Sequence, residues 1–237
     1  MPMINILCMK WGDKYGSEYV NKLYSMVHRH LHRDFRFICL TDNAIGLRKE
    51  IETKPIPEMK LPDDIPERCW RKLTSFSSAL NLTGVILYLD VDTIIVDSID
   101  RFFDYPGDFV IIKDWRKDTG QSSVYRYNPG MYEDVLHNFQ NNPYEIIKNY
   151  RNEQEYLTDY IRKKHTLTYW PKKWVSSFKY HCTQWFPFAL WREPVIPRKT
   201  SIITFHGLPN PPDAYEGTKS KWYRYILPTP WIREHWQ

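Results

Sequence analysis

The sequence predicts an α/β fold, with a mostly parallel central sheet, helices on both faces and an irregular C-terminal part. Three observations support this prediction. Strand-like and helix-like segments alternate through the first half of the chain, as in proteins built from βαβ units. Polar residues follow four of the predicted strands, and ligands of such sheets bind beyond the carboxyl ends of the strands. After residue 165 the pattern breaks into short pieces rich in Trp and Pro.

The beginning of the chain shows this alternation clearly. Residues 4–9 are apolar and predict a first strand. Residues 17–31 carry apolar side chains at helical spacing, and Ser17 is the expected N-cap of that helix. Residues 35–40 predict a second strand, and residues 50–54 a short third one.

The middle of the chain continues the pattern after a proline-rich connection over residues 55–66, where proline cannot donate to a strand ladder. A helix is expected over 67–80, a turn at Thr83-Gly84 and the central strand over 85–89. The remaining expected elements are a short helix over 98–103 that Ser98 caps, strands over 109–113, 122–127 and 201–205, and helices over 132–139 and 153–163.

The composition is that of a soluble globular protein. Of the 237 residues, 42% are hydrophobic and 26% are charged, close to the averages for such proteins. The net charge of +5 is mild, and the basic residues are scattered among 28 acidic ones. A nucleic-acid binder usually carries a concentrated basic stripe, which this chain lacks. The small positive excess suits an anionic small molecule such as a nucleotide diphosphate.

Cysteine and hydropathy patterns predict a cytoplasmic protein. Cys8, Cys39, Cys69 and Cys182 lack CxxC spacing, so we expect buried free thiols in a reducing compartment. No apolar run approaches membrane-spanning length, and the N-terminus shows no signal-peptide pattern. The sequence therefore predicts no transmembrane segment.

Aromatic residues are unusually frequent, at 16% of the chain. Their large rigid rings suit stacking on sugars or bases, but core packing explains many of them equally well. The tryptophans of the second half have the same two interpretations, a sugar-stacking wall or a second small core: Trp170, Trp174, Trp185 and Trp191.

The most informative motif is Asp90-Val91-Asp92, directly after the predicted strand over 85–89. Side chains alternate along an extended backbone, so both carboxylates point to the same side. Paired carboxylates are costly unless a positive charge compensates them. Mg²⁺ and Mn²⁺ prefer oxygen donors and bind through one or two carboxylates plus substrate phosphates. The alternative interpretation is a pair of acids that cap a turn and the following helix.

Polar residues follow four predicted strands, and one crevice at their carboxyl ends would collect them all. They lie at Lys10 to Asp13, Thr41 to Asn43, Asp90 to Asp92, and Asp114. This convergence supports a ligand site more strongly than any single motif does.

Three further groups fit such a site, and each has a structural alternative. His206 ends an apolar strand, so it is either a third manganese ligand or a hydrogen-bonded turn histidine. Arg71 and Lys72 precede the acidic strand and either reach phosphates or lie on a solvated helix face. Asn152 begins a helix whose N–H groups and amide side chains can hold hydroxyls, although capping explains it equally well.

With these residues assembled, the chain resembles metal-dependent glycosyltransferases of the GT-A (Rossmann-like) fold. More narrowly, it is similar to bacterial nucleotide-sugar transferases distantly akin to the glycogenin and lipopolysaccharide galactosyltransferase families. The likeness covers nearly the whole chain and is carried by residues 8–16, 39–42, 70–73, 88–93, 152–154 and 205–207. The position of the acid triplet at a strand end, with a late His-Gly loop, is more specific than the triplet alone.

The resemblance implies a nucleotide-sugar donor, expected to be a UDP-sugar, bound at the first strand ends. The residues implied to hold base and ribose are Lys10, Trp11, Tyr15, Thr41 and Asp42. Asp90 would touch ribose and metal, Asp92 and His206 would complete a Mn²⁺ or Mg²⁺ site, and Arg71 or Lys72 would meet the diphosphate.

The resemblance also implies an acceptor side. Asp114, Glu153 and Gln154 would face the donor sugar or the acceptor hydroxyl and are the expected catalytic residues. Related transferases often place a Lys soon after the His-Gly pair. In this chain the next candidates are Lys219 and Lys221.

The predicted activity is sugar transfer from a nucleotide diphosphate to an acceptor hydroxyl in a single domain over residues 1–237. About residues 1–115 would bind the nucleotide and about 116–237 the acceptor, a carbohydrate or a glycolipid. The aromatic, weakly basic segment over 222–236 could dock an acceptor lipid or oligosaccharide, although packing against the body explains it better. Peripheral membrane contact is compatible with the sequence. If the anomeric configuration inverts, Asp114, Glu153 or Asp159 would be the base, whereas retention demands none.

Two rival functions remain open at this point. The first is a haloacid-dehalogenase-type phosphatase with Asp90 as nucleophile and Asp92 as general acid. That motif needs a later Gly-Asp-x-x-x-Asp, and Gly107-Asp108 lacks the second acid. The second rival is a non-catalytic carbohydrate-binding protein that uses the Trp-rich region.

Overall fold

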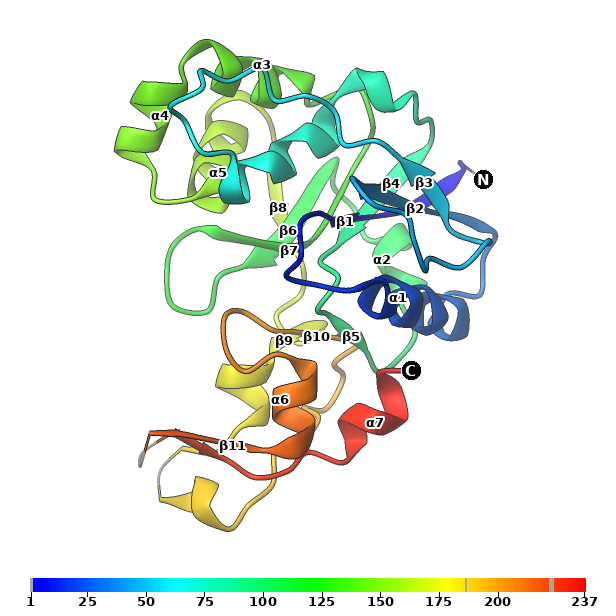
Figure 1. Ribbon diagram of the computed structural model, residues 1–237, viewed down its shortest axis with the longest axis vertical. Helices are drawn as coiled ribbons and strands as arrows, with labels where there is room; N and C mark the ends of the chain where they lie inside the picture. Colours follow the sequence, from blue (N-terminus) through cyan, green and yellow to red (C-terminus); the bar gives the residue numbers. More distant parts are fainter. Residues whose placement is uncertain (1, 186, 222–223) are drawn as a thin grey trace. The chain divides into compact units, whose positions relative to one another are not determined.

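The computed structural model describes residues 2–185, 187–221 and 224–237, without the side chains of 219–221 and 224 (Figure 1). The chain forms two compact units. The first unit comprises residues 2–14, 34–89 and 106–170, and the second unit comprises 15–33, 90–105 and 171–237. The chain passes between them several times, so neither unit coincides with a predicted half. The single-domain organisation stays a prediction.

The first unit is built around a seven-stranded sheet. Its strands are β1 (Ile4–Lys10), β2 (Phe35–Thr41), β3 (Glu52–Lys54), β4 (Val85–Leu89), β6 (Phe109–Lys113), β7 (Gly120–Tyr127) and β8 (Leu167–Tyr169). Their order is β3-β2-β1-β4-β7-β6-β8, and β7 alone runs antiparallel to its neighbours. The carboxyl ends of β1, β2, β4 and β6 therefore lie along one edge, as predicted. The mixed α/β, mostly parallel fold is confirmed.

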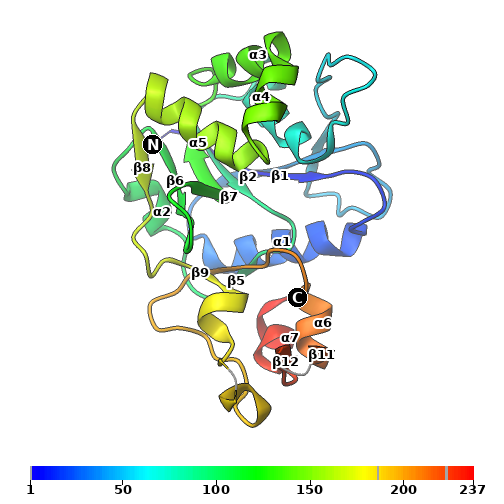
Figure 2. The ribbon, with the colours of Figure 1, turned by 90° about the vertical axis from the view of Figure 1, so that its left-hand side faces the viewer.

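A helical layer covers one face of this sheet (Figure 2). It contains η1 (Arg68–Phe76), η2 (Ser78–Leu80), α3 (Glu133–Asn141), α4 (Pro143–Asn149) and α5 (Glu153–Lys164). Alternate strand residues such as Leu7, Ile111 and Tyr125 pack with Phe139 and Leu157 of the helices in one core. Residues of the opposite face, for example Ile6 and Leu87, are also buried. Burial on both faces explains why these strands are almost continuously apolar.

The predicted helix over 67–80 is wrong in type, because the structure has two 3₁₀-helices there. Ser77, between η1 and η2, is extended, and its side chain accepts a hydrogen bond from the Ala79 N–H. The Thr74 hydroxyl bonds back to the Arg71 carbonyl at 2.8 Å. Hydroxyl side chains compete in this way with regular helical hydrogen bonding. Asn81 then ends η2 in the left-handed region, at φ 50°.

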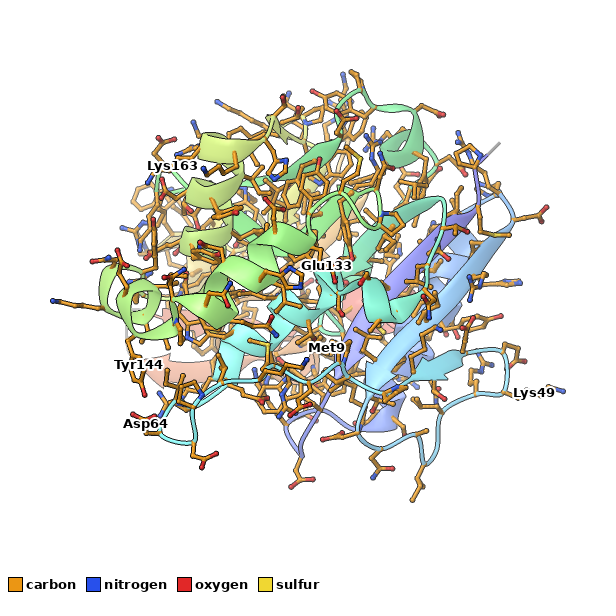
Figure 3. The ribbon with its side chains drawn as sticks, turned by 90° about the horizontal axis from the view of Figure 1, so that it is seen from above. Met9, Lys49, Asp64, Glu133, Tyr144 and Lys163 are labelled. Atoms are coloured by element: carbon orange, nitrogen blue, oxygen red, sulfur yellow. The ribbon has the colours of Figure 1, made fainter. Side chains whose placement is uncertain are left out.

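The turn at Gly84 and the proline-rich connection of the first unit agree with the prediction. Gly84 forms the predicted turn at φ +91°, where a Cβ would lie 2.0 Å from the Met3 carbonyl oxygen. The proline-rich connection carries Asp64, which accepts a hydrogen bond from Tyr144 of α4 at 2.8 Å (Figure 3). The sequence did not predict α4, which starts with Pro143, a residue suited to the first helical position.

The second unit is less regular. Its helices are α1 (Ser17–His30), α2 (Arg101–Asp104), η3 (Phe178–Cys182), η4 (Phe188–Leu190), α6 (Pro211–Glu216) and α7 (Trp231–His235). A three-stranded sheet has the order β5-β10-β9, with β5 (Ile94–Ile95), β9 (Val175–Ser177) and β10 (Ile202–Thr204). β11 (Thr218–Lys221) and β12 (Arg224–Ile226) pair separately.

Two of the predicted N-caps and one cysteine differ from the prediction. Gly16, rather than Ser17, is the N-cap of α1, while Asn152 caps α5 by accepting from the Glu155 N–H at 3.1 Å. The Ser98 hydroxyl accepts from the Asp100 N–H, but Asp100 is the N-cap of α2. All four cysteines are free, as expected, but Cys69 is exposed rather than buried. Among the described residues no helix is long and apolar enough to cross a membrane.

Candidate functional site

The carboxyl ends of β1 and β2 bring together four residues predicted to hold a nucleotide. Lys10 and Thr41 lie side by side in the parallel register. The Gly12 N–H after β1 donates to the Asp42 carboxylate after β2 at 2.9 Å. The Thr41 hydroxyl receives the Asn43 N–H at 3.1 Å. The two strand ends thus form one hydrogen-bonded corner that presents polar groups at the ligand-binding edge of the sheet.

Trp11 and Arg71 form a stacked pair beside this corner. The Arg71 guanidinium lies 4.8 Å from the Trp11 ring centroid, and it also pairs with Glu67 one helical turn earlier. The Trp11 side chain remains 39% exposed. A planar ring with a cation on one face is suited to stacking on a base and to attracting phosphate.

Lys72 and Glu153 lie together, although the resemblance implied a diphosphate contact for Lys72 and a catalytic role for Glu153. The Lys72 ammonium is 3.8 Å from the Glu153 carboxylate, and both contact Ser122 of β7, at 3.3 and 2.8 Å respectively. Glu153 is only 6% exposed. A buried carboxylate beside an ammonium and a hydroxyl is stabilised where it lies. The structure thus places a residue predicted to contact phosphate beside a residue predicted to be catalytic.

Asp114 and Gln154 lie where the β6–β7 connection meets α5. One Asp114 carboxylate oxygen accepts the N–H groups of Arg116 and Lys117 at 2.8 and 2.9 Å, so it caps a turn. The Gln154 carbonyl accepts the Thr158 hydroxyl at 2.6 Å. The Lys117–Glu155 ion pair, at 2.8 Å, holds the connection against the helix. The catalytic roles of Asp114, Glu153 and Gln154 stay predictions.

Asp159, the third candidate base, lies one turn farther along α5. It pairs with Lys163 at 2.7 Å and accepts a hydrogen bond from the Tyr150 hydroxyl. These groups line a cleft of about 280 Å³ between α3, α4 and α5. Burial raises the pKa of Asp159, but the hydrogen bonds from Lys163 and Tyr150 and the neighbouring positive charges together outweigh it and lower that pKa.

The acid triplet belongs to the second unit. Asp90 directly follows β4, and its carbonyl accepts both the N–H and the hydroxyl of Thr93, at 3.2 and 2.8 Å, which closes a turn. The Asp92 carboxylate is buried and accepts the Tyr15 hydroxyl at 2.7 Å. Burial, and then the negative charge of Asp92, raises the pKa of Tyr15 well above its ordinary value. Tyr15 therefore stays protonated and acts as a donor to this carboxylate.

Strand pairing brings the segments of Asp92 and His206 to the same end of the small sheet. Asp92 lies two residues before Ile94 of β5, and His206 lies two residues after Thr204 of β10. β5 and β10 are antiparallel, with Ile94 opposite Ile203, so the start of one strand adjoins the end of the other. Nothing in the local sequence around either residue reveals this pairing.

His206 has two contacts that the sequence analysis missed. Its Nε2 lies 2.6 Å from the Ser177 hydroxyl at the end of β9, and the Tyr180 ring is 5.1 Å away. Ser177 also donates its N–H to His181 Nδ1 at 2.9 Å. Ser177 stands in a short strand with no motif around it, so only the β9–β10 pairing reveals its place.

The described residues contain no group of three or more His, Cys, Asp or Glu side chains placed to hold a metal ion. The chemistry of the predicted donor set nonetheless fits Mn²⁺ or Mg²⁺, since Asp90 and Asp92 supply oxygen and His206 supplies nitrogen. The metal ligands stay predictions, and the side chains of Lys219 and Lys221 lie outside the described residues.

The architecture is similar to crystal structures of the galactosyltransferase LgtC. The match to LgtC in complex with donor and acceptor sugar analogues has a TM-score of 0.60 and 15% sequence identity, and covers 87% of this chain and 88% of LgtC. The match to an active-site mutant of LgtC has a TM-score of 0.58 and 16% identity, and covers 87% and 89%. The chain has the GT-A fold.

The GT-A fold confirms the architecture that the resemblance implied. At this level of sequence identity the likeness concerns the fold. No family model matches the sequence, and neither does any curated protein. The two rival functions, phosphatase and carbohydrate-binding protein, gain no support from these matches.

Proposed function

We propose that this protein is a metal-dependent glycosyltransferase. It transfers a sugar from a UDP-sugar to a hydroxyl group of a carbohydrate or glycolipid acceptor. The observation that carries the proposal is the position of Asp90-Val91-Asp92. The triplet follows the central strand of a GT-A fold shared with a galactosyltransferase that was crystallised with donor and acceptor sugar analogues.

The nucleotide would be held at the ends of β1 and β2. The exposed Trp11 ring offers a stacking surface for the base, and the Arg71 guanidinium on that ring offers a positive charge for phosphate. Thr41 and Asp42 offer a hydroxyl and a carboxylate for the ribose. These groups belong to one hydrogen-bonded corner, so they are preorganised and lose little freedom when the nucleotide binds.

Asp90, Asp92 and His206 would hold a Mn²⁺ or Mg²⁺ ion. A bound ion of this kind supplies positive charge that stabilises a departing diphosphate. Tyr15 and Ser177 form hydrogen bonds with the Asp92 carboxylate and the His206 imidazole and orient both groups. If transfer inverts the anomeric centre, a carboxylate must take the acceptor proton. Asp114, Glu153 and Asp159 are the candidates on the acceptor side.

Isothermal titration with UDP tests the proposal. The wild-type chain should bind UDP with Mn²⁺ or Mg²⁺ and lose that binding in EDTA. Asp92→Ala should weaken metal-dependent binding roughly 100-fold or more, since changes to mere supporting groups cost 10- to 100-fold. Asp97→Ala, a nearby carboxylate that accepts the Ser98 N–H, is the matched control and should bind as the wild type does.

Activity assays distinguish a glycosyltransferase from a phosphatase and from a carbohydrate-binding protein. A panel of UDP-sugars should show metal-dependent hydrolysis or transfer that Asp92→Ala abolishes. Release of phosphate from phosphomonoesters without UDP affinity would assign the phosphatase function instead. Retention of sugars without turnover, unaffected by EDTA, would assign a carbohydrate-binding protein.

A further inference from the structure

Lys10, the last residue of β1, is an almost fully buried lysine. It is only 6% exposed, although lysine is almost never buried to this degree without a charged partner. Among the residues that the structure describes, none forms a hydrogen bond or an ion pair with the Lys10 ammonium. A buried charge without a counter-charge is costly to the folded state. Lys10 therefore offers an uncompensated positive charge to a ligand.

The sheet fixes the direction in which Lys10 points. Side chains alternate along a strand, and Leu7 and Met9 of β1 pack in the core beneath the helical layer. Lys10 therefore points to the opposite face of the sheet, as does its register partner Thr41 at the end of β2. Ile6, on the same face as Lys10, is fully buried. The stem of Lys10 thus continues an apolar surface, and its length brings the ammonium to the carboxyl edge of the sheet, where ligands bind.

The order of the strands places Lys10 between two parts of the proposed donor site. β1 lies between β2 and β4 in the sheet. The end of β2 carries Thr41 and Asp42, the proposed ribose contacts, and the acid triplet directly follows β4. In a nucleotide sugar the diphosphate joins the ribose to the sugar. A nucleotide with its ribose at the end of β2 and its phosphates toward the acids after β4 would therefore pass the end of β1.

The two cations predicted to meet the diphosphate already have carboxylate partners. Arg71 forms an ion pair with Glu67 one helical turn earlier. The Lys72 ammonium lies 3.8 Å from the Glu153 carboxylate. A carboxylate at this distance opposes the attraction of an anion to the same cation. Lys10 has no such competing group among the described residues.

We infer that the Lys10 ammonium binds a phosphate group of the nucleotide diphosphate. The resemblance implied only a contact with base or ribose for this residue. Hydrogen bonds between an ammonium and a phosphate are charge-assisted and strong, and the anion supplies the counter-charge that the buried ammonium lacks. Positive charge at this position also stabilises a departing diphosphate. The nucleotide rests on the proposed function, whereas the affinity of Lys10 for an anion is measured independently with inorganic pyrophosphate.

The inference predicts opposite effects of one substitution on stability and on binding. Lys10→Met retains the length of the side chain and removes the buried charge. It should raise the melting temperature of the ligand-free protein by about 2–4 °C, because the cost of the uncompensated charge disappears. A lysine that serves only the fold would have the reverse effect, since its loss would lower the melting temperature. Thermal unfolding followed by circular dichroism measures this.

Isothermal titration of the full chain with inorganic pyrophosphate, UDP and uridine, each with Mg²⁺, tests the binding. Lys10→Met should weaken the binding of pyrophosphate and of UDP about tenfold or more, and should leave uridine binding within about twofold of the wild type. Lys10→Gln, a second neutral variant, should behave in the same way. Lys10→Arg retains the charge and should keep most of the pyrophosphate affinity. Lys49→Met, which removes an exposed lysine of the same unit (Figure 3), is the matched control and should bind all three ligands as the wild type does.

Three results would overturn the inference. Unchanged pyrophosphate and UDP binding in both neutral variants would remove Lys10 as the phosphate contact. An equal loss of uridine and UDP binding would assign Lys10 to the nucleoside, as the resemblance implied. A wild-type protein that binds no pyrophosphate would show that the buried charge serves no anion. Pyrophosphate binding that depends on Lys10, without any UDP binding, would instead support the anion contact and contradict the proposed function.

Discussion

The predicted site residues of the two units are held by partners of different kinds. In the first unit, Glu153 lies beside the Lys72 ammonium and is almost fully buried. In the second unit, Asp92 accepts a hydrogen bond from the Tyr15 phenol, and His206 shares one with the Ser177 hydroxyl. The first arrangement joins opposite charges, and the second joins ionisable groups to neutral hydroxyls.

The kind of partner affects how easily each side chain can exchange it for a ligand. A buried ion pair is costly to break, because either partner alone would be an uncompensated charge. A hydrogen bond from a neutral hydroxyl contributes only about 1 kcal/mol net, so a cation can displace it. We therefore expect Glu153 and Lys72 to support the fold, and Asp92 and His206 to serve ligand binding.

Glu153→Ala should have the largest effect on the free energy of unfolding. The substitution leaves the Lys72 ammonium without its carboxylate and should cost about 2–4 kcal/mol, somewhat less than a fully buried pair because Lys72 keeps partial exposure. Urea unfolding followed by circular dichroism measures it. Glu155→Ala, which removes the more exposed pair with Lys117, is the control and should cost less than about 1 kcal/mol. Unchanged stability with lost sugar transfer would make Glu153 catalytic, as the sequence suggested.

His206→Ala should affect binding more than folding. Loss of the imidazole should weaken metal-dependent UDP binding about tenfold or more and lower the free energy of unfolding by no more than about 1 kcal/mol. Ser177→Ala retains the imidazole and removes only its hydroxyl partner, so it should bind metal and UDP nearly as the wild type does. Equal metal affinity in His206→Ala and wild type would remove His206 from the predicted ligands.

Tyr15→Phe separates two predictions for one side chain. If the hydroxyl only occupies Asp92 until the ion arrives, its removal should raise Mn²⁺ affinity about threefold, because no hydrogen bond is lost on binding. Titration of Mn²⁺ without nucleotide measures this. Weaker UDP binding at saturating Mn²⁺ would instead support the nucleotide contact that the resemblance implied for Tyr15.

We expect the smallest change in the free energy of unfolding at Glu133, a residue that supports the fold of the first unit. Its carboxylate, on α3 (Figure 3), accepts both the N–H and the hydroxyl of Ser78, and the hydroxyl bond in particular lowers its pKa below 4.5. A lowered acid pKa stabilises the fold above the unfolded value and loses that effect as pH falls through the folded value. Glu133→Ala should therefore cost about 0.5–1 kcal/mol at neutral pH and progressively less in acid. A cost independent of pH in urea unfolding would contradict this assignment.

The two units also differ in how well the sequence predicted them. The strands β1, β2, β4 and β6 were placed within a residue or so, because each is a continuous apolar run closed by polar residues. β5, β8 and β9 have two or three residues each, too few for a periodic signal. They exist because a neighbouring strand pairs with them, as β10 does with β5 and β9.

The predicted site residues divide in the same way, into those that strand ends reveal and those that only packing brings together. Lys10, Trp11, Thr41 and Asp42 were found because parallel strands end together at one edge. The Lys72–Glu153 pair was not foreseen, since 81 residues separate its members and only the packing of η1 and α5 on β7 joins them. Ser177 was missed for the same reason. The docking of an acceptor lipid or oligosaccharide by 222–236 stays a prediction, and residues 222–223 lie outside the described residues.

The sequence by itself determined the fold class, the positions of the main strands along the chain and the position of Asp90 and Asp92 at a strand end, because these depend on local hydrophobic pattern and chain direction. Tertiary structure alone decided which side chains pair, as Glu153 does with Lys72 and Asp92 with Tyr15, since a side chain's partners come from segments distant in the chain. It also decided which tryptophans are buried, because exposure is a property of packing and not of residue type.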